Sequence, residues 1–248
     1  MNSPARSKIP GVVFRRRVPS RSVRTLPSAP FSGAALLLLA LALLAACGKS
    51  GSSPAALPQG LGLLQQSGQA MGNVSSAHVD LTFDGNLCCF ISSAQGDISR
   101  DGKANGSFVL GGAEYPFRLL KGTFYLKPPT GRWVTSPPPY DPTKLLDPTN
   151  GLPSILAKAT AGTTQASESV GGVDAYRVTA SIPTELIKGL TDLAAGQDTL
   201  KATVWIATSD NRLVKFRIPY RAKDATEDTV LTGTITHFGV QVSVTPPV

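Results

Sequence analysis

The sequence predicts an α+β domain in which short helices cover one side of an antiparallel sheet, behind an N-terminal leader. Segments with alternating apolar and polar residues recur through most of the chain after residue 73. Many of them are separated by only two to five turn residues, and connections this short join antiparallel strands. The few helical segments are too short to form a bundle of their own, so their apolar faces must pack on the sheet.

The predicted N-terminal leader comprises residues 1–46. Residues 1–33 are polar and rich in arginine, and 34–46 form a run of thirteen apolar residues. A spanning helix needs about 20 such residues, so the run is typical of a signal peptide rather than of a permanent membrane segment.

The net charge of +8 belongs almost entirely to this leader. Seven of the 24 Lys and Arg precede residue 47, and none of the 16 Asp and Glu does. The remaining chain is nearly neutral, so the sequence gives no reason to expect a nucleic-acid partner.

Cys47 ends the apolar run. The tetrapeptide Leu44-Ala45-Ala46-Cys47 resembles the lipobox of bacterial lipoproteins, which predicts Cys47 as the S-diacylglycerol and N-acyl attachment site. Ordinary cleavage near Ala46 is the alternative, and a twin-arginine route for residues 15–17 is disfavoured by the Val18-Pro19 that follows. Residues 47–60 are then the lipidated cysteine and a flexible tether, of which the eleven residues Gly48–Pro58 span about 18 Å on average, and the body lies outside the cytoplasmic membrane.

The body begins with a helix and continues with strands. Apolar residues three and four apart from Leu61 to Met71 predict a helix that ends before Asn73. Alternation over residues 77–83 predicts the first strand, which stops at Asp84-Gly85. Further strands are predicted at Phe90–Ser99, Gly106–Leu110, Tyr115–Leu120, Thr123–Lys127, Ala175–Ser181, Ala202–Thr208, Arg212–Pro219, Val230–Phe238 and Val240–Thr245. Two more helices are predicted at Leu152–Ala159 and Thr184–Ala194.

No catalytic or metal-binding motif is recognisable. The nucleophile elbow, the zinc-protease motif, the phosphate loop and the dinucleotide fingerprint are absent from the sequence. Of the two histidines, His78 lies on the polar side of its strand and His237 near a strand end, so both are expected to have surface or hydrogen-bonded structural roles. We expect no enzymatic activity, no cofactor and no metal.

Two further segments admit alternatives. Cys88 and Cys89 are expected to be reduced packing residues, and a strained vicinal disulfide is the other option. The proline-rich residues 127–142 are expected to form a stiff loop that carries Trp133 into the structure rather than a polyproline ligand.

At the level of motifs, the chain resembles the LppX/LprG family of mycobacterial envelope lipoproteins over roughly residues 61–247. The matching pieces are Ser76-Ala77-His78, Gly122 with Tyr125-Leu126 before Trp133, Tyr140-Asp141-Pro142, Asp147–Leu152 running into Ile155-Leu156-Ala157, Ala202–Ile206, Leu213-Val214 and Val244–Pro247. The chain departs from the family pattern at Cys88-Cys89 and in a shorter segment around residues 111–120, which affects cavity size and lipid preference.

The resemblance implies a curved antiparallel half-barrel over residues 61–248, of the LolA/LolB type, whose concave side is closed by helices around an apolar cavity. It also implies binding of multiply acylated lipids such as triacylglycerol, phosphatidylinositol mannosides, lipoarabinomannan or phthiocerol dimycocerosates. The same resemblance implies that these lipids are moved toward the outer membrane. It also implies a major-facilitator transporter as a further partner.

Apolar positions on the predicted elements are the candidates for the cavity wall. They are Val79, Leu81, Phe83, Phe108, Leu110, Phe117, Leu119, Leu156, Leu186, Leu190, Val204 and Ile206. A filled core would contain the same residue types, so a structural or signalling lipoprotein that binds a membrane protein is the alternative function. A hydrolase acting on acyl esters through His78 or His237 is a third, disfavoured hypothesis.

Overall fold

The computed structural model describes residues 56–85, 91–137, 140–187, 198–220 and 229–247. The chain divides into two units, Met1–Pro54 and Ala55–Val248, and everything below concerns the second. Cys47, Cys88, Cys89 and Leu190 lie outside the described residues.

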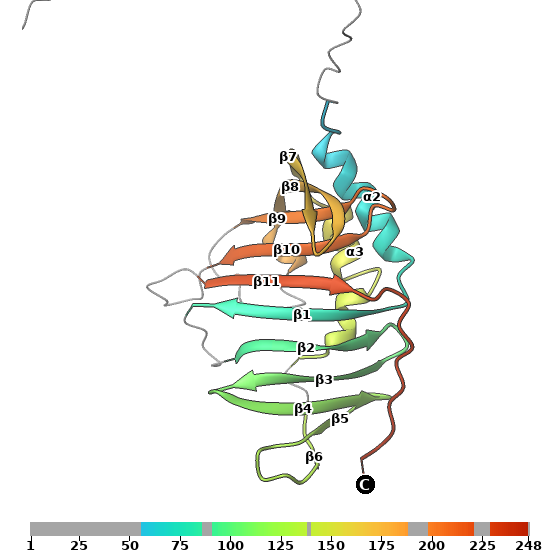
Figure 1. Cartoon of the computed structure of the whole chain (residues 1–248), viewed down its shortest axis with the longest axis vertical. Coiled ribbons are helices and arrows are strands. Elements are labelled where there is room, and N and C mark those ends of the chain that lie inside the picture. Colours follow the sequence, from blue (N-terminus) through green and yellow to red (C-terminus); the bar gives the residue numbers. More distant parts are fainter. Residues whose placement is uncertain (1–55, 86–90, 138–139, 188–197, 221–228, 248) are drawn as a thin grey trace, which may run out of the picture. The chain divides into compact units, whose positions relative to one another are not determined.

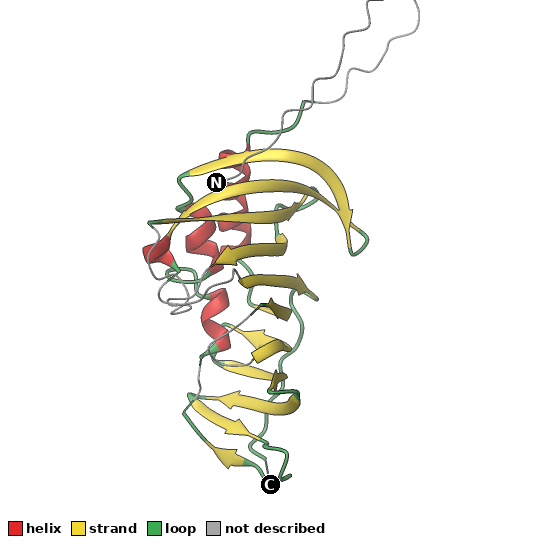
Figure 2. Ribbon diagram, turned by 90° about the vertical axis from the view of Figure 1, so that its left-hand side faces the viewer, coloured by secondary structure: helices red, strands yellow, loops and turns green. Residues whose placement is uncertain are grey.

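A single antiparallel sheet of eleven strands organises this unit (Figure 1). Strand order is β6-β5-β4-β3-β2-β1-β11-β10-β9-β8-β7, so β1 and β11 meet in the middle and the two edges are β6 and β7. The strands are β1 Ser76–Asp84, β2 Ile91–Ser99, β3 Lys103–Leu110, β4 Ala113–Leu120, β5 Thr123–Leu126, β6 Val134–Thr135, β7 Ala161–Val170, β8 Val173–Pro183, β9 Thr199–Ala207, β10 Leu213–Tyr220 and β11 Thr229–Thr236. The sheet curves, most visibly at β7 and β8, and its edges do not pair with each other (Figure 2).

Tight glycine turns explain why neighbouring strands are antiparallel. Gly111 and Gly112 have φ angles of 58° and 82°, and Gly171 and Gly172 have 58° and 83°. Two consecutive residues with positive φ form the two-residue turn whose twist matches a hairpin. Such a turn at Gly111-Gly112 joins β3 to β4, and an equivalent turn at Gly171-Gly172 joins β7 to β8.

The helices lie on one side of the sheet (Figure 2). They are α2 Gly60–Gly72 and α3 Leu152–Ala157, with the short 3-10 helices η1 Pro142–Leu146 and η2 Thr184–Leu186. Gly68 lies where α2 meets α3, and a Cβ atom there would be 2.7 Å from the Pro153 carbonyl oxygen. Among the described residues, no helix is both long and apolar enough to span a membrane.

Most predicted elements are confirmed to within three residues at their ends, and the exceptions have physical causes. The predicted strand Val240–Thr245 is wrong, because residues 237–247 run past the ends of β1 to β4 instead of alongside a strand (Figure 1). Hydrogen bonds hold this segment there: the Gly239 N–H donates to the Ser76 carbonyl, and Arg118 Nη1 to the Thr245 carbonyl. Strand β7, at the sheet edge, was not predicted, and only the first turn of the predicted helix Thr184–Ala194 falls within the described residues as a 3-10 helix.

Candidate functional site: the inner face of the sheet

The inner face is the side of the sheet that packs against the helices. Val79 on β1 is 5% exposed and belongs to the same buried cluster as Leu64 and Met71 of α2 and Leu156 of α3. Since side chains alternate along a strand, residues 77, 79, 81 and 83 of β1 share this face. The strand register carries the assignment across to the other strands.

Part of the inner face is a closely packed core. Six of the predicted wall residues lie there and are at most 8% exposed: Val79, Phe117, Leu119, Leu156, Val204 and Ile206. Ile206 has no exposed surface, so no space that a water-sized sphere can enter adjoins it. These side chains hold the helices on the sheet.

Exposure rises along the strands away from this core. On β1, Ala77 is 0% and Val79 is 5% exposed, whereas Leu81 and Phe83 are only partly buried. On β3, Ala104 is 0% exposed, whereas Phe108 and Leu110 are partly buried.

The two gradients run in the same direction. Leu81 and Phe108 both pair with Ala94 of β2, so the partly buried side chains adjoin one another. Through the pairs Phe83 to Leu231 and Leu231 to Ile218, the same region continues onto β10. We call Leu81, Phe83, Phe108, Leu110 and Ile218 the half-buried end of the inner face. Leu186 of η2 is partly buried against the same core, and Ile218 was not among the predicted residues.

Glycines and aromatic rings shape this face. Gly233 on β11 lies under the Phe216 ring, and a Cβ atom at Gly233 would be 2.2 Å from its Cζ. On β3 and β4, Phe108 stacks on Tyr115 with centroids 5.4 Å apart, and Phe117 stacks on Phe124 at 5.6 Å. Local patterns gave no sign that Gly233 is needed, because the reason is a ring on the neighbouring strand.

Tyr140 places a buried hydroxyl beside the core. Its side chain packs against the buried cluster, and its hydroxyl oxygen has no hydrogen-bond partner among the described residues. Burial, with a smaller contribution from the adjacent Asp141, raises the pKa of Tyr140 far above its usual value. The phenol is therefore neutral at any physiological pH.

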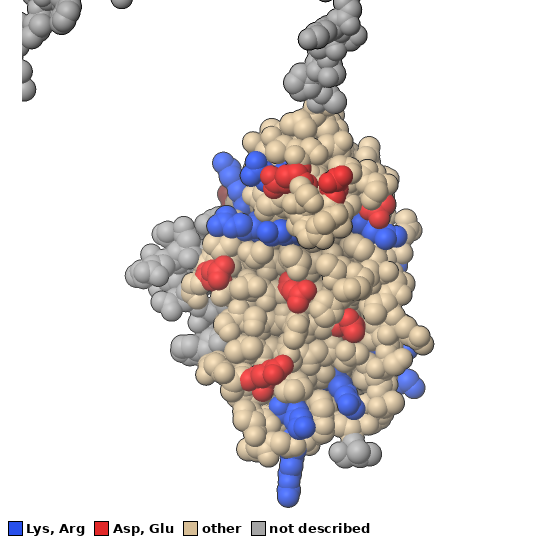
Figure 3. Space-filling model, viewed as in Figure 1, with Lys and Arg blue, Asp and Glu red and all other residues tan. Residues whose placement is uncertain are grey.

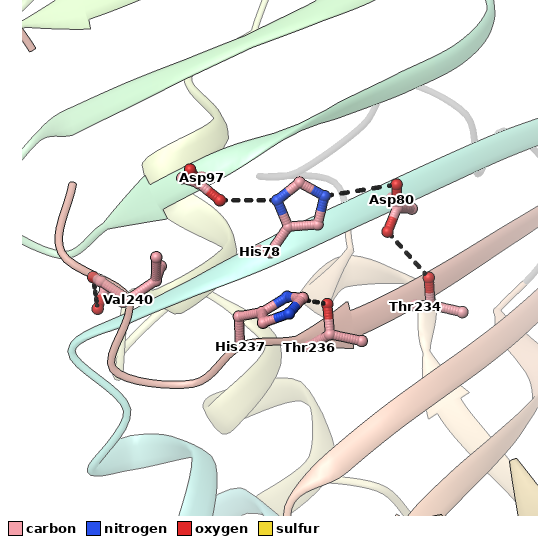
Figure 4. A network of polar contacts seen from close by, with 8 residues as sticks. His78, Asp80, Asp97, Thr234, Thr236, His237 and Val240 are labelled. Carbon is pink, nitrogen blue, oxygen red and sulfur yellow. Dashed lines mark hydrogen bonds and ion pairs between the residues drawn. The ribbon is translucent and has the colours of Figure 1, made fainter. Parts of the chain in front are cut away.

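The two histidines lie on the outer face, away from the apolar region (Figure 4). His78 Nδ1 is 2.7 Å from a carboxylate oxygen of Asp97, and its Nε2 is 3.6 Å from Asp80. The Thr234 hydroxyl reaches Asp80 at 3.4 Å, and the His237 ring meets His78 edge-on at 5.9 Å. These contacts join β2, β1 and β11, which is the hydrogen-bonded structural role expected of His78.

A surface groove of about 480 Å³ lies where β1 begins and β2 ends, at the opposite end of these strands from the half-buried end of the inner face. It is lined by Ser75, Ser76, Ser99, Arg100, Asp101, Val240 and Val242. Arg100 donates to the carbonyls of Gly72 and Val74 at 2.8 and 2.6 Å, where α2 ends. Within the described residues, no group of three or more His, Cys, Asp or Glu could hold a metal ion.

Trp133 in the proline-rich segment is partly buried. The Arg118 guanidinium stacks over its ring at 4.9 Å, so the loop is tied to the outer face of β4.

Comparison with known proteins identifies relatives over nearly the whole body. Residues 58–244 match the family model described as LppX_LprAFG lipoprotein. A Mycolicibacterium hassiacum protein named lipoarabinomannan carrier protein LprG is 30% identical over 228 residues, which cover 86% of this chain and 95% of that protein. The protein of the same name from Mycolicibacterium smegmatis is 27% identical over 226 residues, covering 86% of this chain and 94% of that one.

Solved structures show the same fold. The crystal structure of LprF from Mycobacterium bovis superposes with a TM-score of 0.67 at 23% identity, covering 77% of this chain and 99% of that one. Lipoprotein LppX from Mycobacterium tuberculosis gives a TM-score of 0.58 at 23% identity, covering 74% and 97%. The family model matches three quarters of this chain, so the chain belongs to the LppX_LprAFG lipoprotein family.

Proposed function

We propose that this protein is a membrane-anchored lipid carrier that binds multiply acylated lipids or glycolipids against the inner face of its sheet. The single observation that carries the proposal is the half-buried end of the inner face. Four of its five apolar side chains pack against the filled core, and all five keep accessible surface, which is what a wall for acyl chains requires. The name of the LprG relatives supports a lipoglycan-type ligand.

The chemistry of the ligand explains why a carrier is needed. Moving one chain of about sixteen carbons from a bilayer into water costs on the order of 12 kcal/mol, at ~0.8 kcal/mol per methylene. Apolar side chains that replace the bilayer remove this cost without a covalent step, so the function requires no catalytic group.

The proposal also covers the membrane anchor of the carrier, its cargo and the direction of transport. Acylation of Cys47 would hold the protein on the extracytoplasmic face of the cell membrane, with residues 47–60 as its tether and 61–248 as the lipid-binding domain. The cargo would be of the triacylglycerol, phosphatidylinositol mannoside, lipoarabinomannan or phthiocerol dimycocerosate class. It would travel toward the outer membrane, with a major-facilitator transporter as a candidate partner.

A filled-core lipoprotein that binds a membrane protein is the alternative. Its support is the packed part of the inner face, where Leu156, Val204 and Ile206 are at most 2% exposed. The two functions differ in whether acyl chains enter the half-buried end.

A transfer assay separates them. Protein lacking residues 1–47 is mixed with donor vesicles that contain a fluorescent triacylated lipid, and transfer to acceptor vesicles is followed. The carrier hypothesis predicts transfer that Leu110→Trp abolishes, because the indole fills space at the half-buried end. Val134→Trp is the matched control, since Val134 is 45% exposed on edge strand β6.

Circular dichroism and thermal unfolding establish that both variants fold. Absence of transfer by the unaltered protein, or equal transfer by the Leu110→Trp variant, would contradict the proposal.

A further inference from the structure

Charge is divided unevenly over the outer face of the sheet. On the strands nearest edge β7, that is β7 to β10, the outward positions of the register carry four basic residues and one acidic residue: Arg177, Lys201, Lys215, Arg217 and Glu168. On β1 to β4 the outward positions carry four acidic residues and two basic ones: Asp80, Asp84, Asp97, Glu114, Lys103 and Arg118. In Figure 3 a band of Lys and Arg crosses the upper part of this face, with carboxylates above and beside it, and further carboxylates are scattered below it, with more Lys and Arg at the lower end.

Aromatic rings lie beneath the basic residues. The Lys215 ammonium stands 4.9 Å from the centre of the Trp205 ring, and the Arg212 guanidinium 5.0 Å from that of Phe238. Trp205 is 8% exposed within a small apolar cluster on this face, and its indole N–H donates to Glu168 at 2.6 Å. Basic groups over aromatic rings suit the boundary between lipid headgroups and acyl chains. We call Arg177, Lys201, Arg212, Lys215 and Arg217, with Trp205 and Phe238, the basic face. Two of its cations have acidic partners, since Arg212 lies 3.4 Å from Asp210 and Arg177 lies 3.7 Å from Glu168. Its surplus positive charge therefore comes from Lys201, Lys215 and Arg217.

The chain enters the domain at edge β7, on the inner side of the sheet, because Thr164 and Gly162 pair with the core residues Val178 and Ala180. The Thr164 hydroxyl of β7 donates to the Pro58 carbonyl at 2.7 Å. Gly60 packs so closely on β7 that a Cβ atom there would be 2.6 Å from the carbonyl carbon of Gly162. These contacts fix Pro58 and Gly60 at edge β7.

The length of the chain between Cys47 and Pro58, compared with the spacing of the strands, indicates which end of the sheet can lie near an acylated Cys47. Pro58 lies eleven positions after Cys47, so the chain between them reaches at most about 38 Å when fully extended. Edge β6 lies ten strand steps from β7, which is a path of about 48 Å along the curved sheet at ~4.8 Å per step. Strand β9 lies two steps away, or about 10 Å.

We propose that the basic face of β8 to β10 rests on anionic lipid headgroups, so that the domain stands with its β7 end toward the membrane. The inference rests on acylation of Cys47 in the proposed function, and it adds the surface and the lipid charge that orient the carrier. The acidic outer face of β1 to β4 is repelled by the same headgroups. Screening by salt weakens the contact.

The two tryptophans of the chain report on the orientation. Trp205 lies in the basic face, whereas Trp133 lies beside β6. Full acylated protein, with acylation verified by intact mass, is reconstituted into vesicles of phosphatidylcholine with phosphatidylglycerol that carry a dansyl lipid. Energy transfer is measured in Trp133→Phe, which keeps Trp205, and in Trp205→Phe, which keeps Trp133.

We expect strong transfer from Trp205 and weak transfer from Trp133, and a loss of this difference in phosphatidylcholine alone or at high salt. Replacing Lys201 and Arg217 by Glu should reduce transfer from Trp205, since each basic residue near an anionic surface contributes roughly fivefold to its affinity. Lys121→Glu with Arg132→Glu is the matched control at the other end and should leave transfer unchanged.

Equal transfer from both tryptophans, or an equal effect of the two charge reversals, would overturn the proposal. Hydrogen exchange on the unaltered protein gives a second test that needs no Trp205→Phe variant. Anionic lipid should slow exchange in β8 to β10 and leave exchange in β3 to β5 unchanged. The reverse pattern, or no protection, would also overturn the proposal. Lipid transfer by the carrier, measured separately, shows whether a failure concerns the orientation or the proposed function itself.

Discussion

Replacing glycine by alanine at two positions of α2 should change stability in opposite directions. Gly62 and Gly68 lie in the same helix, so the gain in helix propensity is about 0.8–1.0 kcal/mol for each. A Cβ atom at Gly62 would have no neighbour within 4 Å. At Gly68 it would be 2.7 Å from the Pro153 carbonyl oxygen and 2.9 Å from the Ala157 Cβ. Helix α3 must therefore move away in the Gly68→Ala variant.

The size of the difference follows from this comparison. Overpacking a close contact costs about 1–3 kcal/mol, and the propensity gain is common to both variants. Gly62→Ala should raise the free energy of unfolding by about 0.8 kcal/mol, and Gly68→Ala should fall below it by about 1–3 kcal/mol. Urea unfolding of the protein lacking residues 1–47 measures both values. Equal stabilisation by the two variants would refute the close packing of α2 on α3.

Three further changes test other parts of the structure. Tyr140→Phe should raise the free energy of unfolding by about 1 kcal/mol, because it removes a buried hydroxyl without a described partner; destabilisation would mean that the hydroxyl is bonded. Arg100→Ala should lower that free energy by about 1–2 kcal/mol through loss of the hydrogen bonds to the end of α2, with Arg132→Ala, at an exposed site, as a control within ±0.5 kcal/mol. Gly233→Val should cost about 1–3 kcal/mol or more by displacing the Phe216 ring, and a near-neutral result in thermal unfolding would contradict that contact.

Much of the fold follows from local sequence because alternation and turns act over a few residues. Residues 77–83 alternate clearly, and the structure pairs them with β2 and β11. Strand β7 escaped prediction because it is a polar edge strand: its residues alternate between exposed and partly buried, and none is fully buried. The segment Val240–Thr245 has a strand-like pattern, but it pairs with no described strand, and its carbonyls instead accept from side chains, Val240 from the Ser76 hydroxyl and Thr245 from Arg118.

The candidate site could be predicted only as a set of apolar positions. Alternation places Val79 and Phe83 on the same face of β1, yet Val79 is 5% exposed and Phe83 is only partly buried. The difference depends on how far α2 and α3 extend across the sheet, which is a property of the packed domain. The basic face was not predicted either, because its cations lie on different strands and are brought together only by the register of the sheet.

Native mass spectrometry of the non-acylated protein, purified from a host rich in acylated glycolipids, tests the central proposal most directly. The carrier account predicts a second species that is heavier by one multiply acylated lipid per chain, and Leu110→Trp should remove it while Val134→Trp retains it. A single species at the mass of the polypeptide, from protein that unfolds cooperatively, would contradict lipid carriage and favour the filled-core alternative.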